Sequence, residues 1–232
     1  MLPRAVPPSN LRQQVKSIGL RHCVLILSPD TPTPMHRALR LRAGVSLARI
    51  DLSLPQDQRR KALHPKWRNQ LKHAEGAGLR IVHATLPAEP SHPLLMEEAQ
   101  MAQSRRYNTW PPTLTAAFAQ TAPQQTRLFT ALKGNTPIAQ MLFLRHGIAA
   151  TYHIGKTTAL GRTTNAHNLL LWHASNWLAD HGHTQLELGT LDPQTPDLNR
   201  FKLRAGATPH LRNVVDPCAL DHPCPNAHIM II

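Results

Sequence analysis

The fold of this chain is decided by the stretch Arg127-Leu-Phe-Thr-Ala-Leu-Lys-Gly-Asn-Thr-Pro-Ile-Ala-Gln-Met-Leu-Phe-Leu-Arg-His-Gly-Ile-Ala-Ala-Thr-Tyr-His-Ile154. It contains three apolar runs, and turn residues separate them at Gly134-Asn135 and at Arg145-His-Gly147. Tight turns between apolar runs are typical of antiparallel strands that follow one another across a sheet. The stretch therefore predicts a three-stranded antiparallel meander.

Strands and helices are also predicted on both sides of the meander. The pattern of apolar residues, prolines and glycines predicts further strands at 23–27, 45–52, 79–83, 184–188 and 209–215. It predicts helices at 91–106, after Pro112, at 166–181 and at 197–204, and a loop at 155–164. This order predicts a mixed α/β (α+β) fold, in which helices flank a largely antiparallel central sheet.

One further helix combines an apolar side with strongly basic faces. Ser53 and Pro55 predict its start, and Gly76 predicts its end. Its apolar residues recur every three or four positions, which predicts one buried stripe: Leu63, Trp67, Leu71 and Ala74. Its other faces carry Arg59, Arg60, Lys61, Lys66, Arg68 and Lys72.

Composition restricts the class of protein and its partners. The 232 residues carry a formal net charge of +13, which favours anionic partners, and 41% are hydrophobic, which is enough for a core. No run approaches the about 18 apolar residues of a membrane-spanning helix, and no secretory signal is recognisable. Three unevenly spaced cysteines do not form a disulfide framework, which predicts a cytoplasmic protein. We expect a basic, proline-rich arm over 1–17 and a single domain over 18–232.

Three segments together resemble the FemAB-type branch of the GNAT superfamily of N-acyltransferases. The first is the basic helix and turn Leu63-His-Pro-Lys-Trp-Arg-Asn-Gln-Leu-Lys-His-Ala-Glu-Gly-Ala-Gly-Leu79. The second is Ala166-His-Asn-Leu-Leu-Leu-Trp-His-Ala-Ser-Asn-Trp-Leu-Ala-Asp-His-Gly182. The third is Leu186-Glu-Leu-Gly-Thr190, followed by Leu198-Asn-Arg-Phe-Lys-Leu-Arg-Ala-Gly-Ala207 with its Phe-Lys pair. The resemblance extends from about residue 59 to 212.

The resemblance implies an enzyme that moves an acyl group to an amine. It implies acyl-CoA as the donor, or aminoacyl-tRNA as in the peptidoglycan-bridge enzymes, and it leaves the acceptor amine unidentified. This chain departs from those bridge enzymes because it has room for about one GNAT-like domain instead of two. Its segment Gly155–Thr164 also lacks the Arg-x-x-Gly-x-Gly/Ala pattern of typical acetyl-CoA users. Both donors therefore stay open, and we expect acyl-CoA as the donor, with aminoacyl-tRNA as the alternative.

A phosphate-bearing donor needs amides and cations, which the start of a helix can supply. We expect this donor site in the segment before and at the start of the helix at Ala166, at Gly155, Lys156, Gly161, Arg162, Asn165 and Asn168. The alternative is an ordinary solvated glycine loop. Arg68 and Arg200 are expected to contact substrate phosphates or the acceptor.

The resemblance assigns Lys202 of the Phe201-Lys202 pair to the catalytic site, where it would hold a phosphate or stabilise developing negative charge. A general base could be His153 or Glu187, and Asp192 and His167 are further possibilities. The residue types alone do not choose among these four.

The sequence also bears on metal binding and on nucleic-acid binding. Cys218-Ala-Leu-Asp-His-Pro-Cys224 is too widely spaced for a zinc knuckle, so we expect no metal. The net charge suits a non-enzymatic nucleic-acid-binding protein. However, only 4% of the residues are aromatic, which leaves little surface for base stacking.

Overall fold

The computed structural model describes residues 13, 17, 24–26, 39–216 and 229–231, with side chains at 13, at 17 and from 45 to 211. The chain forms two compact units. One comprises residues 1–47, 190–192 and 209–232, and the other comprises 48–189 and 193–208. The predicted arm and the Cys218–Cys224 segment lie almost wholly outside the described residues, so the expected domain boundaries stay predictions.

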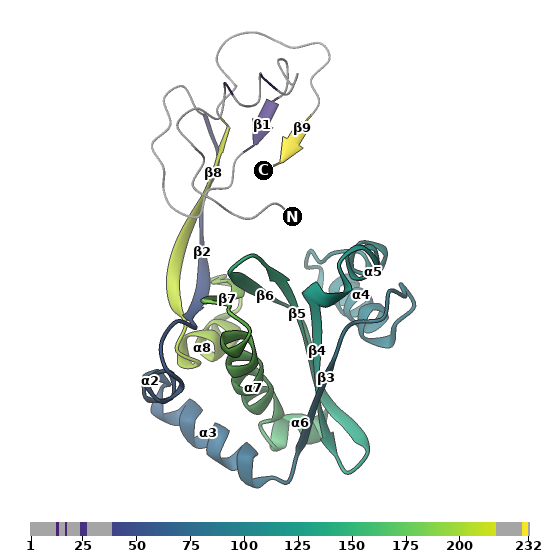
Figure 1. Ribbon diagram of the computed structural model, residues 1–232, viewed down its shortest axis with the longest axis vertical. Helices are drawn as coiled ribbons and strands as arrows, with labels where there is room; N and C mark the ends of the chain where they lie inside the picture. The colour runs from purple at the N-terminus through teal and green to yellow at the C-terminus, as the bar shows by residue number, and fades with distance from the viewer. Residues whose placement is uncertain (1–12, 14–16, 18–23, 27–38, 217–228, 232) are drawn as a thin grey trace. The chain divides into compact units, whose positions relative to one another are not determined.

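The predicted strands and helices follow one another in the predicted order, and α6 and β9 are additional elements (Figure 1). The strands are β1 (Val24–Ile26), β2 (Leu39–Asp51), β3 (Arg80–Ala84), β4 (Thr126–Lys133), β5 (Thr136–His146), β6 (Ala149–Thr157), β7 (Gln185–Thr190), β8 (Thr208–Asp216) and β9 (Ile229–Ile231). The helices are α2 (Gln56–Ala62), α3 (Pro65–Gly76), α4 (Pro93–Arg105), α5 (Pro112–Thr121), η1 (Pro123–Gln125), α6 (Ala159–Thr163), α7 (Ala166–Asp180) and α8 (Pro196–Arg204).

Seven strands form the central sheet, in the order β3-β4-β5-β6-β7-β2-β8, and β1 pairs with β9 in parallel. Strands β3 to β6 pair antiparallel, which confirms the predicted meander and the mixed α/β class. Both hairpin turns contain a glycine with positive φ, at 60° for Gly134 and 56° for Gly147, a conformation that glycine adopts without strain.

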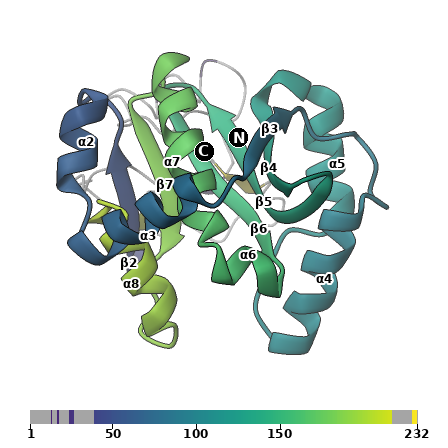
Figure 2. The same cartoon turned by 90° about the horizontal axis from the view of Figure 1, so that it is seen from below.

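Helices cover both faces of the meander (Figure 2). On one face, α4 and α5 pack on it through a core cluster that includes Leu94, Leu95 and Ala116 beside Leu142 of β5. On the other face lies α7, whose Trp177 ring meets the ring of Phe129 at 6.0 Å. The apolar strands are therefore buried on both sides, as their nearly continuous hydrophobic sequence requires.

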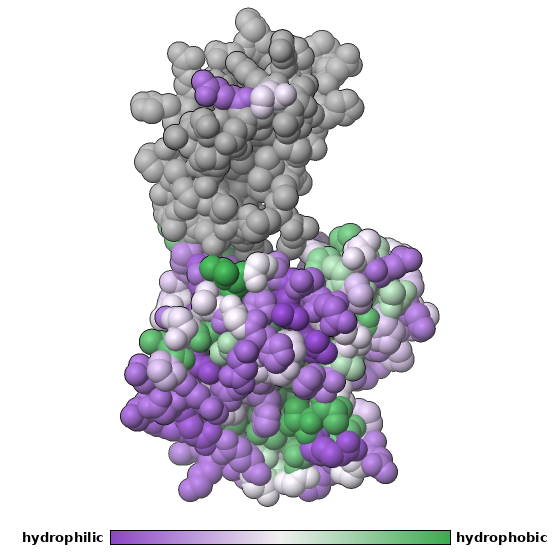
Figure 3. Space-filling model, viewed as in Figure 1, coloured by the Kyte–Doolittle hydropathy of each residue, from purple (hydrophilic) through white to green (hydrophobic). Residues whose placement is uncertain are grey.

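The basic helix is interrupted, contrary to the prediction of one helix. Helix α2 ends at Ala62 and α3 begins at Pro65, because the residue before a proline is driven out of helical geometry. Ser53 does not cap α2, since its amide and hydroxyl both bond to Asp51. The predicted stripe is confirmed: all four of its residues are buried, with Trp67 at 1% exposure and Leu71 at 0%. Figure 3 shows the mainly hydrophilic surface over α2 and α3.

The predicted loop at 155–164 is also wrong in part. Strand β6 continues to Thr157, and α6 forms a short helix directly after it. Gly161 makes this possible, because a Cβ there would lie 2.3 Å from the carbonyl oxygen of Ile138 on β5. No helix in the described part of the chain is long and apolar enough to cross a membrane.

Candidate active site

Strands β6 and β7 are neighbours in the sheet but pair over only three residues each. Ala149 to Thr151 of β6 pair in parallel with Gln185 to Glu187 of β7. Beyond these pairs β6 continues beside β5 as far as Thr157, while Leu188 and Gly189 have no partner on β6. The two strands therefore separate and leave an opening in the middle of the sheet.

A β-bulge lies on β6 where the opening begins. Leu142 of β5 pairs with Ile154, whereas the next residue, Phe143, pairs with Tyr152. His153 is consequently the extra residue, without a partner on β5. Bulges bend a strand and increase its twist, and they are frequent beside active sites because they redirect side chains.

A small pocket lies at the opening. Residues of β5, β6, β7, α7 and α8 line it: Met141, Tyr152, Leu171, Leu188, Leu198, Phe201 and Lys202. Most of this lining is apolar. Its polar groups are the hydroxyl of Tyr152 and the ammonium of Lys202. The volume of this pocket is about 10 Å³, so it has room for roughly one water-sized group beside Tyr152 and Lys202.

Tyr152 depends on Gly155 for its position. A Cβ at Gly155 would lie 1.7 Å from the Tyr152 hydroxyl oxygen, so any side chain there would displace the phenol ring. Burial raises the pKa of Tyr152, and the nearby charge of Glu98 raises it further. The phenol is therefore protonated at neutral pH and available as a hydrogen-bond donor.

Lys202 is a buried cation at the same pocket, with 5% of its surface exposed. Its Nζ lies 3.8 Å from the position that a Cβ would take at Gly189, near the end of β7. Gly189 has φ +81°, a left-handed conformation that favours glycine. Strand β7 thus approaches the ammonium closely, at the point where it has separated from β6.

His153 points to the other face of the sheet from this pocket. Its ring contacts Trp110 at 4.9 Å between centroids, and its Nε2 lies 3.1 Å from the hydroxyl of Thr115 on α5. Burial lowers the pKa of His153 to about 4. A histidine so weakly basic is neutral at physiological pH and is a poor proton acceptor.

The depressed pKa of His153 predicts a pH dependence of stability. An unfolded chain protonates this ring below pH 6.5, but the folded protein does so only near pH 4. Stability from this group is therefore complete above pH 6.5 and is lost as the pH falls to 4, with an upper bound of about 3 kcal/mol. We expect His153→Gln to reduce this loss in urea unfolding across that range. Parallel curves for parent and His153→Gln would contradict the assignment.

Glu187 lies on the paired part of β7 and is buried at 3% exposure. Its Oε1 is 3.1 Å from Nη2 of Arg49 on β2. This ion pair stabilises the ionised carboxylate, and it ties β7 to β2 on the side away from β6. Asp192 belongs to the other compact unit of the chain.

The residues predicted to hold the donor are largely engaged within the protein. Lys156 forms an ion pair with Glu97 of α4. The amide of Gly161 donates to the capping hydroxyl of Thr158 at 3.1 Å, and Arg162 Nη1 donates to the Thr157 carbonyl at 3.3 Å. This turn is therefore a capped helix start and not an open glycine loop.

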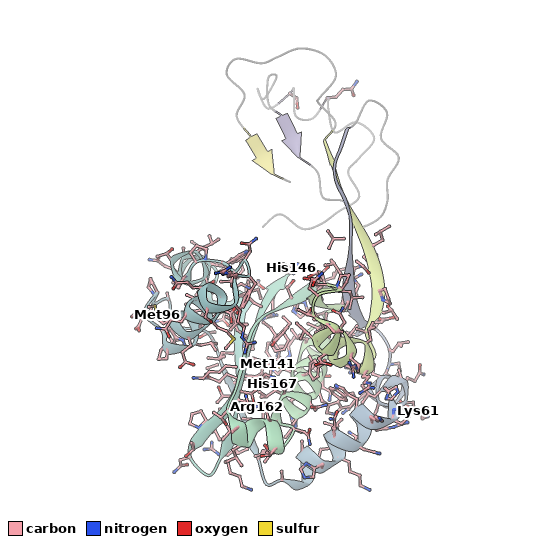
Figure 4. All side chains as sticks on the ribbon, turned by 180° about the vertical axis from the view of Figure 1, so that it is seen from behind. Lys61, Met96, Met141, His146, Arg162 and His167 are labelled. Atoms are coloured by element: carbon pink, nitrogen blue, oxygen red, sulfur yellow. The ribbon has the colours of Figure 1, made fainter. Side chains whose placement is uncertain are left out.

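The first turn of α7 joins α6, β6 and α3. His167 Nε2 lies 2.8 Å from the carbonyl oxygen of Lys156, and burial lowers the pKa of His167. Asn165 has φ 53° and its side chain does not cap α7, because its Nδ2 lies 3.1 Å from Nδ1 of His73. Asn168 is buried, and its amide is 3.4 Å from Gln70 Oε1. Figure 4 labels His167 and Arg162 at this end of α7, and Met141 on β5.

The two predicted substrate-binding arginines differ in their surroundings. Arg68 is half-buried on α3, one residue after Trp67 and outside the apolar stripe. Arg200 is exposed on α8 and bonds to Asp197 through Nη2 at 2.7 Å. Neither residue lines the pocket at the opening.

Residues 59–203 match the family model described as an acetyltransferase (GNAT) domain. The chain belongs to this GNAT family. No curated protein sequence matches the chain. Membership of the GNAT family makes the protein an acyltransferase, which confirms the predicted enzyme class.

Solved structures show that this GNAT protein shares its fold with FemX. A crystal structure of FemX has a TM-score of 0.70 at 11% identity, and the match covers 90% of this chain and 75% of that one. A conserved protein of unknown function from Bacteroides thetaiotaomicron gives 0.54 at 11%, covering 90% and 67%. L-PGS from Bacillus licheniformis gives 0.50 at 10%, covering 79% and 63%. These likenesses concern the fold alone.

The sequence did not identify Tyr152 as a residue of this GNAT pocket. It is one of only two tyrosines in the chain, and it lies three residues before Gly155 on a predicted strand. The spacing alone could not reveal the bulge that places this ring beside that glycine. The sequence signal that could have pointed to Tyr152 is a rare aromatic residue shortly before a glycine in a predicted strand.

Proposed function

We propose that this protein transfers an acyl group from acyl-CoA to an amine in the opening between β6 and β7. The observation that carries the proposal is the loss of pairing between these strands after Thr151. From Tyr152 onward, β6 pairs with no strand on the side that faces the opening. An extended donor arm with amide groups can pair with such an edge as an added strand would.

The pocket residues suit the reaction. The amine nitrogen attacks the thioester carbon, the carbonyl oxygen gains negative charge, and the carbon–sulfur bond then breaks. We assign to Lys202 the stabilisation of the developing charge, and to the protonated Tyr152 a hydrogen bond to the carbonyl oxygen or the leaving sulfur. The proton lost by the amine passes to solvent at the opening.

The other predicted catalytic residues receive supporting roles in this proposal. His153 occupies the bulge and contacts Trp110, so it fixes the bend of β6. Glu187 holds β7 to β2 through Arg49. Both therefore help to keep the strands apart, and neither is proposed as the base. A cytoplasmic location stays a prediction.

Aminoacyl-tRNA is the second candidate donor, and one observation favours it. The capped turn at Gly161 and the ion-paired Lys156 reduce the groups available for the phosphates of CoA at the predicted place. The net charge of +13 also suits an RNA partner.

Ligand-induced stabilisation distinguishes the two donors, since a ligand that binds only the folded state raises the melting temperature. We expect CoA at micromolar to millimolar concentration to raise the melting temperature, and acetyl-CoA to release thiol in the presence of an amine panel. A shift with deacylated tRNA but none with CoA would overturn the acyl-CoA assignment and favour the second candidate.

Arg68 provides a test of the basic side of α3. We expect Arg68→Ala to fold normally but to weaken CoA binding severalfold at low salt, because a half-buried cation at the surface still attracts phosphates through an interaction that salt screens. The loss should shrink as the salt concentration rises. Lys61→Ala, at an exposed ion pair on α2, is the control with no expected effect. Equal CoA affinity of Arg68→Ala and the parent protein at low salt would show that the basic side of α3 is a solvated surface that does not bind the donor.

A further inference from the structure

A second pocket, of about 330 Å³, lies between the end of β2, α2, α3, α7 and the end of α8. Its volume is at the lower end of the range for small-molecule sites. The wall is largely apolar and includes Ile50, Leu63, Leu171 and Trp172. It is larger than the pocket at the opening, and the acyl transfer proposed above does not use it.

Arg59 lines this pocket and is a buried cation without an anionic partner. It is 8% exposed, and its Nε donates to the carbonyl of Leu54 at 3.0 Å. Its Nη1 is buried and has no hydrogen-bond partner, and no carboxylate among the described residues lies within 4.0 Å of it. Burial lowers the pKa of Arg59, and the more distant Asp180 opposes this only in part. A guanidinium stays charged in a protein, so its burial is unfavourable unless an anion accompanies it.

Trp67 contributes a second unused donor to the same pocket. Its Nε1 is buried without a hydrogen-bond partner, although a buried indole N–H is usually bonded. The hydroxyl and carboxylate side chains of the wall have partners. Ser175 donates to Leu171, Asp51 accepts from Ser53, and Thr208 donates to Arg49. The unsatisfied groups are thus both N–H donors, and one of them is positively charged.

We propose that this pocket binds a small carboxylate with an apolar body, whose carboxylate oxygens accept hydrogen bonds from Arg59 and Trp67. The planar fork of a guanidinium matches a carboxylate, and the apolar wall accommodates a hydrocarbon chain or ring. The volume corresponds to roughly ten non-hydrogen atoms, taking about 30 Å³ for each as for a water molecule in the liquid. This site is separate from the proposed acyl transfer and does not depend on it.

The probe pair is octanoate and octanamide, which have the same length and differ in charge. Binding is measured by calorimetry and not by activity. The Trp67 ring also contacts Phe201, which is next to Lys202, so a change in activity could come from either pocket. We expect the parent protein to bind octanoate at least tenfold more tightly than octanamide. Equal binding of the two, binding of neither, or a preference for inorganic phosphate would overturn the proposal, and this comparison needs no variant.

Two variants on one helix locate the charge preference. Arg59→Met is expected to abolish the preference for octanoate. Arg60→Met is the matched control, since Arg60 lies over the same Trp172 ring at 5.4 Å but is exposed and bonded to Glu75. It should keep the preference, and a loss equal to that of Arg59→Met would contradict the assignment.

The melting temperature gives an independent readout. Without ligand, Arg59→Met should melt no lower than the parent protein, because it removes an unpaired buried charge. Octanoate should raise the melting temperature of the parent and of Arg60→Met but not that of Arg59→Met. An octanoate shift that persists in Arg59→Met would overturn the proposal.

Discussion

Trp67→Ala is expected to lower the free energy of unfolding by about 3–5 kcal/mol, the range for an aromatic residue truncated in a core. Trp67 is 1% exposed and contacts Phe201 of α8 at 6.3 Å between ring centroids, so its removal leaves a cavity between α3 and α8. Such a loss is a large part of the stability of an ordinary domain. Urea unfolding, or the yield of soluble protein, measures the effect.

The neighbouring variant Arg68→Ala is the control for Trp67→Ala. Arg68 lies about 100° further around α3 and is half-buried, so its truncation should change stability by less than about 0.5 kcal/mol. Trp67→Ala protein that is as stable as the parent but inactive would show that the indole faces substrate instead of the core.

Lys202→Met is expected to reduce the rate of acyl transfer at least tenfold, or about 1.4 kcal/mol at the transition state. Methionine keeps most of the length of the side chain and removes the ammonium that we assign to charge stabilisation. The melting temperature is measured beside the rate, so that a loss of folding is distinguished from the loss of the ammonium. Thiol release from acetyl-CoA with the amine panel measures the rate.

The matched control for this variant is Lys61→Met, at an exposed lysine on α2. It should retain the parent rate, since Lys61 is 79% exposed and pairs with Asp57 on its own helix. Parent activity in Lys202→Met would remove Lys202 from the catalytic site, whatever the donor.

The elements of this protein were largely predictable because their signals are local. The glycines at the hairpin turns and the apolar spacing around Trp67 depend on residues that are close in the sequence. The meander turns and the buried stripe that they predict were both confirmed. Pro65 marks the break in the sequence, but the apolar spacing continues across it and predicts one helix. The α6 turn was missed because it depends on Gly161 packing against β5.

The partners of the candidate site residues could not be predicted, because they come from distant parts of the chain. Lys156 and Glu97 are 59 residues apart, and Arg49 and Glu187 are 138 residues apart. The opening itself depends on where β6 and β7 stop pairing, which no local pattern records. The contacts of the candidate site residues are therefore set by how whole helices and strands pack together.

A crystal structure of the protein with bound CoA tests the central claim most directly. The account predicts that the donor arm lies along the free edge of β6, with its thiol in the opening between β6 and β7 beside Tyr152 and Lys202. CoA bound at another surface, with the opening between these strands left empty, would contradict the account.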